Sequence, residues 1–251
     1  MTLQLVAFDL DDTLAPSKSP MDPSMVPLMI SLLAKYEVCV ISGGQIEQFR
    51  AQFLTSLSDA PASALRRLHL MPTCGTQYFR YVDDEWTAVY AENLALDERN
   101  DAMSALKSSA LSLGLWETKT WGPVLEDRGS QVTFSALGQD APLDAKKAWD
   151  PDGAKKSALR AKVAELLPGL EVRSGGSTSI DITRRGIDKA YGMTRLAELT
   201  SIPLDDMLFV GDRLDPEGND YPVRVLGVTT HAVESWEGTR ELLFDLVSPS
   251  Y

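Results

Sequence analysis

Three aspartates crowd the end of a short apolar run near the start of the chain. The segment 6–18 reads VAFDLDDTLAPSK and carries Asp9, Asp11 and Asp12. Carboxylates this close repel one another unless a cation or a basic side chain offsets their charge. Carboxylate oxygens are ligands for Mg²⁺, and an aspartate can also attack an electrophile or move a proton. Taken alone, however, the segment predicts only a turn.

Further polar residues follow other short apolar runs in the chain. They are Ser42, Gly43, Gly44, Lys189, Gly211, Asp212, Asn219 and Asp220. A serine hydroxyl and glycine amides can donate hydrogen bonds to phosphoryl oxygens. A lysine at the start of a helix is unfavourable next to the helix dipole, but it fits an anion bound there. Each feature is ordinary alone; in combination they indicate a site for a phosphate and a hard cation.

The elements that must position these residues alternate between strands and helices. Strands are expected at 3–10, 38–41, 68–71, 207–210 and 225–229, and helices at 23–36, 45–57 and 189–200. This alternation predicts an α/β fold, a Rossmann-like parallel sheet with helices on both faces. Ligands of such sheets bind beyond the carboxyl ends of the strands, which is where Asp9, Ser42 and Asp212 fall.

The middle of the chain has a different pattern. A hairpin is expected around residues 83–85, and long helices are expected at 94–113 and 152–167 among strands at 130–136, 170–174 and 177–183. Strand pairs around two long helices predict an α+β module with an antiparallel sheet. We therefore expect a core formed by residues 1–83 and 186–251, with an inserted cap at 84–185.

Composition narrows the classes of function. The chain has 251 residues, 44% of them apolar, and a formal net charge of −12. No run of basic residues supports a nucleic-acid partner, and no apolar run is long enough to span a membrane. Its two cysteines, Cys39 and Cys74, form no disulfide or metal-binding pattern. Because the N-terminus lacks the features of a signal peptide, we expect a cytoplasmic protein.

Four motifs resemble those of the haloacid dehalogenase (HAD) superfamily of phosphotransferases. They are Asp9-x-Asp11-x-Thr13, Ser42, Lys189, and Gly211-Asp212 with Asn219-Asp220. The position of the insert is similar to that in subfamily IIB, whose members carry a large cap. Within that subfamily the long spacing in GDRLDPEGND and the segment SIDITRRGIDK are most similar to the eukaryotic-type phosphomannomutases.

The resemblance implies a role for each matched residue. Asp9 would be the nucleophile that forms an aspartyl-phosphate, and Asp11 the general acid and base. The metal would be Mg²⁺, held by Asp9, by the main-chain carbonyl of Asp11 and by Asp212. Ser42, Gly43, Gly44 and Lys189 would bind the phosphoryl group, and Thr13, Asn219 and Asp220 would support the site. Asp12 stands where the family commonly has glycine and is expected to be structural or a charge beside the site.

The resemblance also implies where the substrate lies. Lys18 falls where the mutases carry an arginine that contacts substrate, and Arg128, Ser179 and Asp181 match cap positions that bind the distal end of a sugar phosphate. The partner is therefore expected to be a small phosphorylated metabolite, a sugar phosphate. The resemblance further allows a homodimer formed through the cap.

Two reactions fit this set of residues. A mutase must hold a second phosphate in its cap, but Gln139 stands where the mutases have an arginine, and only Lys119 could replace another. Losing one or two charged hydrogen bonds, at ~1.5–3 kcal/mol each, would weaken the binding of this second phosphate by several kcal/mol. We therefore expect a Mg²⁺-dependent phosphatase, with a phosphohexomutase as the alternative. A non-catalytic phosphometabolite binder is a third reading, and the nucleophile and proton shuttle argue against it.

Overall fold

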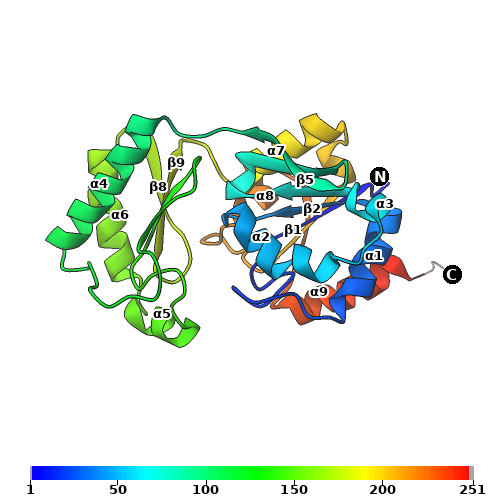
Figure 1. The fold of residues 1–251 in the computed structure, drawn as a ribbon, viewed down its shortest axis with the longest axis horizontal. Coiled ribbons are helices and arrows are strands. Elements are labelled where there is room, and N and C mark those ends of the chain that lie inside the picture. Colours follow the sequence, from blue (N-terminus) through cyan, green and yellow to red (C-terminus); the bar gives the residue numbers. More distant parts are fainter. Residues whose placement is uncertain (1, 249–251) are drawn as a thin grey trace. The chain divides into compact units, whose positions relative to one another are not determined.

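The computed structural model describes residues 2–248 and divides the chain into two compact units (Figure 1). Unit 1 extends to Ala91 and resumes at Ile187. Unit 2 is the intervening segment, Glu92–Gly186. Within the described residues, no helix has the length and apolar character needed to cross a membrane.

Unit 1 is built on a seven-stranded sheet with the order β11-β10-β1-β2-β3-β4-β5. The strands are β1 (Leu5–Phe8), β2 (Glu37–Ile41), β3 (Leu68–Met71), β4 (Gln77–Val82), β5 (Glu85–Ala91), β10 (Met207–Gly211) and β11 (Thr229–Ala232). Strands β11, β10, β1, β2 and β3 are parallel, whereas β4 and β5 add to the sheet in antiparallel fashion. The central strands are short and mostly apolar, as is typical of strands covered on both faces.

Helices cover both faces of this sheet. They are α1 (Met25–Lys35), α2 (Ile46–Gln52), α3 (Ala62–Leu65), α7 (Lys189–Thr200), α8 (Tyr221–Val225) and α9 (Trp236–Val247). Because side chains alternate along a strand, β1 sends Val6 and Phe8 into one apolar core and Leu5 and Ala7 into another. The first core includes residues of α1 and α9, and the second includes residues of α7. The predicted α/β class is confirmed.

The expected helix 45–57 is broken in the structure. Helix α2 ends at Gln52, and a short 3₁₀ helix follows at Leu54–Leu57. Phe53 between them has φ −124° and ψ −56°, which lies outside the helical range, and its side chain is fully buried. Burial of Phe53 in the core therefore accompanies a change of chain direction that the apolar spacing did not indicate.

The expected strand 225–229 is wrong. Val225 is the last residue of α8, and it is 68% exposed. Gly227, with φ +94°, then turns the chain, and β11 begins only at Thr229. The apolar residues of the segment 225–228 thus belong to the end of a helix and to a turn. The real strand is a polar edge strand, which lacks the apolar run typical of a buried one.

The hairpin β4–β5 is part of unit 1. Strand β4 pairs with β3 through His69 and Arg80, and β5 pairs with β4 over its whole length. A boundary after residue 83 would cut this hairpin at its turn, whereas the first segment of unit 1 keeps both strands and extends to Ala91. The antiparallel pairing that looked like the start of the insert is an extension of the core sheet.

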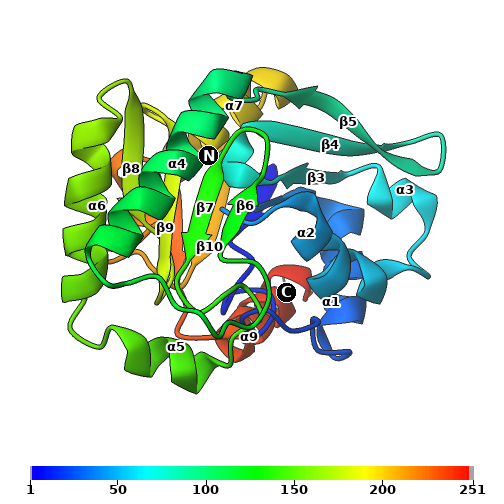
Figure 2. The same cartoon turned by 60° about the vertical axis from the view of Figure 1, so that its left-hand side comes forward.

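Unit 2 has an antiparallel sheet with helices, as its sequence pattern predicts. The sheet order is β6-β7-β9-β8, from β6 (Leu125–Asp127), β7 (Val132–Ser135), β9 (Ser179–Arg184) and β8 (Leu170–Ser174). Helices α4 (Leu96–Ser112) and α6 (Ala154–Leu166) pack against each other and against this sheet (Figure 2), and α5 (Leu143–Trp149) precedes α6. Phe134, Ile180 and Leu106 are fully buried in a core of unit 2's own.

Candidate phosphate and metal site

Three carboxylates converge at the carboxyl end of the sheet in unit 1. Side-chain oxygens of Asp9, Asp212 and Asp220 all lie within 4.8 Å of one another. Asp9 follows β1 and Asp212 follows β10, and these strands are parallel neighbours with Phe8 opposite Val210. Two adjacent parallel strands end side by side, so the two aspartates meet there as the sequence predicts. Asp220 joins them from the start of α8.

Lys189 places its ammonium among these carboxylates. Its Nζ lies 2.5 Å from Asp9 Oδ1 and 2.5 Å from Asp220 Oδ1, and the side chain is only 1% exposed. Burial alone lowers the pKa of Lys189, but Asp220 and Asp9 together raise it well above its ordinary value. The lysine is therefore charged at neutral pH and offsets part of the repulsion at this end of the sheet.

One ammonium cannot neutralise three carboxylates, and the pKa values of two of them reflect the remaining negative charge. Burial raises the pKa of Asp9 well above its usual range, Lys189 opposes this, and Asp220 adds to it. Burial and the charge of Asp220 likewise raise the pKa of Asp212. A donor set made of carboxylate oxygens with excess negative charge suits a hard cation, so the residues present fit Mg²⁺.

Asp11 has a different environment from the other two motif carboxylates. Its Oδ2 accepts a hydrogen bond from Gln48 Nε2 at 2.7 Å, and its Oδ1 accepts from Gln52 Nε2 at 3.1 Å and from the amide of Lys18 at 3.0 Å. The Asp11 carboxylate is not among the converging ligand atoms. Its expected contribution to the metal, a main-chain carbonyl, remains a prediction. Lys18 Nζ lies 3.5 Å from Gln48 Oε1, so Lys18 and Asp11 share a neighbour.

Asp12 is a turn residue. It has φ +58°, its amide donates to the Ala15 carbonyl at 2.8 Å, and its Oδ1 accepts from the Ser17 amide at 3.1 Å. Glycine, asparagine and aspartate are the residues that adopt this left-handed conformation most readily. This geometry supports the structural role expected for Asp12. Next along the chain, buried Thr13 donates from Oγ1 to Asp212 Oδ1 at 3.4 Å.

The loop Ser42–Gly44 follows β2, the other neighbour of β1. Within it the Gly44 amide donates to Ser42 Oγ at 3.2 Å. The loop is held from outside by the turn after β3, because the amides of Thr73 and Cys74 donate to the carbonyls of Gly44 and Ser42, each at 2.9 Å. The structure thus brings the loop to the same edge of the sheet as Asp9. Asn219 is exposed, in the segment between the two C-terminal aspartates.

The predicted substrate contacts of the cap lie in unit 2, on or next to its sheet. Ser179 and Asp181 stand two residues apart on β9 and therefore share a face. Asp181 Oδ1 accepts from Thr133 Oγ1 at 2.7 Å and from Gln131 Nε2 at 2.9 Å. Arg128, in the turn between β6 and β7, pairs with Glu126 at 2.6 Å.

Two features of the site were missed at the level of sequence. Gln48 and Gln52 hold Asp11 from α2, and their spacing of four places them on one helical face, a signal that could have been found. The turn Thr73–Gly75 was missed as well. Its sequence, TCG, matches no recognisable turn motif.

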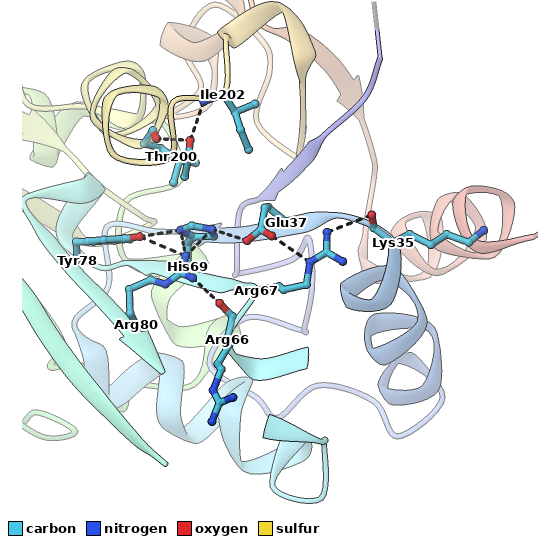
Figure 3. Close-up of polar contacts among 10 residues, drawn as sticks. Lys35, Glu37, Arg66, Arg67, His69, Tyr78, Arg80, Thr200 and Ile202 are labelled. Atoms are coloured by element: carbon cyan, nitrogen blue, oxygen red, sulfur yellow. Dashed lines mark hydrogen bonds and ion pairs between the residues drawn. The ribbon is translucent and has the colours of Figure 1, made fainter. Parts of the chain in front are cut away.

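A second polar cluster is formed by Glu37 of β2, His69 of β3, and Tyr78 and Arg80 of β4 (Figure 3). His69 Nδ1 lies 2.8 Å from the Tyr78 hydroxyl, and His69 Nε2 lies 3.1 Å from Glu37 Oε2, with the guanidinium of Arg80 beside the ring. Burial lowers the pKa of His69, Glu37 opposes this and Arg80 adds to it. Glu37 begins β2 and Ser42 follows the end of that strand, so Glu37 and the loop Ser42–Gly44 lie at opposite ends of β2.

Comparison with known proteins gives consistent results. Residues 143–222 match the family model of haloacid dehalogenase-like hydrolases. Phosphomannomutase 1 of Mus musculus is 25% identical over 254 residues, covering 96% of this chain and 92% of that protein. Phosphomannomutase 1 of Homo sapiens is 24% identical with the same coverage. The phosphomannomutase of Saccharomyces cerevisiae is 29% identical over 138 residues, about half of each chain.

Solved structures share the fold at lower identity. The N-terminally truncated IMP-nucleotidase of Plasmodium falciparum superposes with a TM-score of 0.70 at 15% identity, over 96% of this chain and 69% of that one. A haloacid dehalogenase-like hydrolase from Bacteroides thetaiotaomicron gives 0.64 at 13% identity, over 98% of this chain and the whole of its own. Both likenesses extend through unit 1 and unit 2.

Proposed function

This chain belongs to the haloacid dehalogenase superfamily, and from that premise we propose that it is a Mg²⁺-dependent phosphatase of a small sugar phosphate or a related phosphometabolite. The observation that carries the proposal is the buried Lys189 ammonium, 2.5 Å from both Asp9 and Asp220. Lys189 offsets part of the negative charge of these carboxylates, so that with a bound cation an anionic phosphoryl group could lie beside Asp9. The loop of Ser42 lies at the same edge of the sheet, where its hydroxyl and amides could bind phosphoryl oxygens.

In the proposed reaction, a carboxylate oxygen of Asp9 attacks the phosphorus of the substrate. A bond forms between Asp9 and phosphorus while the ester P–O bond breaks, and the leaving oxygen takes the proton of the Asp11 carboxyl group. A water molecule then attacks the aspartyl-phosphate and gives its proton to Asp11. The bond between Asp9 and phosphorus breaks, inorganic phosphate leaves, and both aspartates return to their first state.

The other residues of the site stabilise charge. Lys189, Ser42 and the amides of Gly43 and Gly44 would bind the phosphoryl oxygens as negative charge shifts during transfer. Asp9 and Asp212 would hold the Mg²⁺ ion with the carbonyl of Asp11. When bound, that ion supplies positive charge to the phosphoryl oxygens.

The arrangement in unit 2 favours hydrolysis over a mutase reaction. A mutase must hold a second phosphate, and arginine is the side chain best suited to do so. Arg128 is paired with Glu126, which offsets its charge. Gln139, at a position where an arginine would serve a mutase, is neutral, and its Nε2 donates to Ser135 Oγ at 2.7 Å. We propose Arg128, Ser179 and Asp181 as substrate contacts of unit 2, and Lys18 as a substrate contact of unit 1.

A phosphohexomutase is the second candidate, and one observation favours it. The relatives that align over nearly the whole chain are named phosphomannomutase. Such an enzyme would use the same nucleophile, Asp9, and the same proton shuttle, Asp11. The two reactions differ in whether the phosphoryl group passes to water or to a second hydroxyl of the sugar. We place either reaction in the cytoplasm; the homodimer allowed by the resemblance stays a prediction.

One assay separates the two reactions. The protein is incubated with Mg²⁺ and mannose 1-phosphate, with and without a hexose 1,6-bisphosphate, and both inorganic phosphate and mannose 6-phosphate are measured. Release of phosphate independent of the bisphosphate is expected. Formation of the 6-phosphate that depends on the bisphosphate would refute the phosphatase and support the mutase.

Two variants in the same segment test the mechanism. Asp9→Asn removes the nucleophile, so activity should fall by several orders of magnitude while the fold is kept. Asp12→Asn makes the same change of charge three residues away, and asparagine tolerates the left-handed turn conformation. It should keep most of the activity. An active Asp9→Asn protein would overturn the mechanism.

A further inference from the structure

Three consecutive residues after β3 adopt left-handed backbone conformations. Thr73 has φ +48°, Cys74 has φ +56° and Gly75 has φ +86°. Residues other than glycine seldom adopt this region, and threonine, which is β-branched, does so least readily. Such strain persists only where the surrounding structure enforces it, and it tends to occur at functional sites. The surroundings of this turn therefore indicate what it does.

One side of the turn contacts the loop Ser42–Gly44, which we call the phosphate loop because the proposed function assigns it to phosphoryl binding. The carbonyl of Ser42 accepts a hydrogen bond from the Cys74 amide, and the carbonyl of Gly44 accepts from the Thr73 amide. In a trans peptide the carbonyl and the following amide point in opposite directions. The amide of Gly43 is therefore directed away from the turn. The turn thus sets the direction in which the loop presents this amide.

The other side of the turn touches α7, the helix that begins with Lys189. A Cβ added to Gly75 would lie 2.6 Å from the Cα of Gly192. A Cβ added to Gly192 would lie 2.8 Å from the Cys74 carbonyl oxygen and would also overlap the side chain of Ile41. The helix and the turn are therefore in backbone contact, and only glycine at both positions permits it.

Gly192 lies three residues after Lys189, so the contact is less than one helical turn from the catalytic lysine. Lys189 is itself held at 2.5 Å from Asp9 and from Asp220, and its side chain is buried. A shift of α7 away from the turn would carry the main chain of Lys189 with it. The ammonium would then have to move relative to the loop at Ser42.

We infer that the turn Thr73–Gly75 and Gly192 form a brace that sets the distance between the phosphate loop and the ammonium of Lys189. Cys74 and Gly192 are accordingly positioning residues, which act on the phosphoryl group through Ser42–Gly44 and Lys189. The identity of the ligand rests on the proposed function. The brace itself rests only on contacts within unit 1.

Two glycine-to-alanine variants test the brace. Gly192→Ala forces the turn and α7 apart. Gly238→Ala is the matched control, because it also lies in a helix, α9, and its added Cβ would make an ordinary contact of 3.6 Å with Val233. Binding of inorganic phosphate in the presence of Mg²⁺ is measured by calorimetry, and the environment of the Lys189 ammonium by ¹H–¹⁵N NMR.

For Gly192→Ala we expect phosphate to bind at least about tenfold more weakly, since one charged hydrogen bond to the phosphate is worth about tenfold or more in affinity. We also expect the Lys189 ammonium signal to shift. Gly238→Ala should match the wild-type protein in both measurements. Wild-type phosphate affinity together with an unchanged ammonium signal in Gly192→Ala would overturn the inference.

A second pair of variants covers the case in which Gly192→Ala does not fold. Cys74→Gly keeps the left-handed turn without strain, so its phosphate affinity should stay within about twofold of wild type. Cys74→Val is β-branched and opposes the turn, so it should weaken phosphate binding and shift the ammonium signal. Equal affinity and equal signals in the two Cys74 variants would refute the brace.

These readouts separate the brace from the proposed function. A wild-type protein that hydrolyses no phosphate monoester would refute the proposed phosphatase, while the ammonium signal would still test the brace. Normal hydrolysis by wild type, together with wild-type phosphate affinity and an unchanged ammonium signal in Gly192→Ala, would refute the brace and leave the phosphatase standing.

Discussion

Replacing Lys189 by methionine should strongly destabilise unit 1 when no divalent cation is present. The lysine side chain is 1% exposed, and its carboxylate partners, Asp9 and Asp220, are 6% and 0% exposed. Lys189→Met keeps the length of the side chain but leaves two buried carboxylates without their cation. Breaking a buried ion pair by removing one partner costs about 3–5 kcal/mol. At about 2–4 °C per kcal/mol for a domain of this size, Tm should fall by about 6–20 °C.

The assay is thermal and urea unfolding in EDTA, repeated in Mg²⁺. Added Mg²⁺ should restore part of the lost stability, because a cation bound at Asp9 and Asp212 again offsets the negative charge. Removing a carboxylate as well, in the double variant with Asp220→Asn, should cost less than the two single changes summed.

An exposed ion pair of the same unit provides the control. Arg195 pairs with Glu198 at 2.7 Å, but the two side chains are 34% and 58% exposed. Arg195→Met should therefore cost no more than about 1 kcal/mol. If Lys189→Met in EDTA costs as little as this control, the argument that the lysine balances buried carboxylates is refuted.

Four further predictions concern other parts of the molecule. Mg²⁺ at about 100 times its dissociation constant should stabilise the wild-type protein by about 2.7 kcal/mol, and Asp212→Asn should lose most of this gain in thermal melts with and without EDTA. Gln52→Leu removes hydrogen bonds to Asp11 and to two main-chain carbonyls. Steady-state kinetics should show slower turnover, and urea unfolding should show a free energy of unfolding lower by about 1–3 kcal/mol. Burial lowers the pKa of His69 in the folded protein, so as the pH falls the unfolded chain binds a proton at this histidine before the folded protein does. The free energy of unfolding should therefore fall as the pH drops below about 6.5. His69→Gln should make the free energy of unfolding depend less on pH in urea titrations between about pH 5 and pH 7. Phe134→Ala should destabilise unit 2 by about 3–5 kcal/mol, and calorimetry should show no change in the unfolding of unit 1.

The centre of the site was predictable because it depends on where strands end. Asp9 and Asp212 each follow a short apolar run, and parallel neighbouring strands bring such positions together. Lys189 was predictable for a similar reason, since it opens a helix whose N-terminus faces the same edge. These placements need only the order and type of the elements.

The direction of individual side chains was not predictable in this way. Asp11 lies two residues from Asp9, yet its carboxylate accepts hydrogen bonds from Gln48 and Gln52 of α2 instead of joining Asp212 and Asp220. Spacing along a sequence does not encode such a difference. The backbone contact between Gly75 and Gly192 is likewise invisible in sequence, because it joins segments that are far apart in the chain.

The edges of the sheet were the least predictable part of the fold. Strand β11 is polar and exposed, so its pattern differs little from that of a loop. The hairpin β4–β5 has the alternating pattern of a half-exposed strand pair, which suits either an extended core sheet or a separate module. Pairing with β3 decides this, and pairing between strands is a property of the folded chain.

The pairing of β1 with β10 has a consequence for the order of events during synthesis. Leu5 lies beside Met207, so the central strand receives its second neighbour only after unit 2 has left the ribosome. Until then one edge of β1 has no partner strand, and Asp9 has neither Lys189 nor Asp220 beside it. An unpaired apolar edge is prone to aggregation. The nascent N-terminal segment therefore exposes an aggregation-prone edge during synthesis, and the carboxylate cluster with Lys189 can form only late in translation, as the last quarter of the chain emerges.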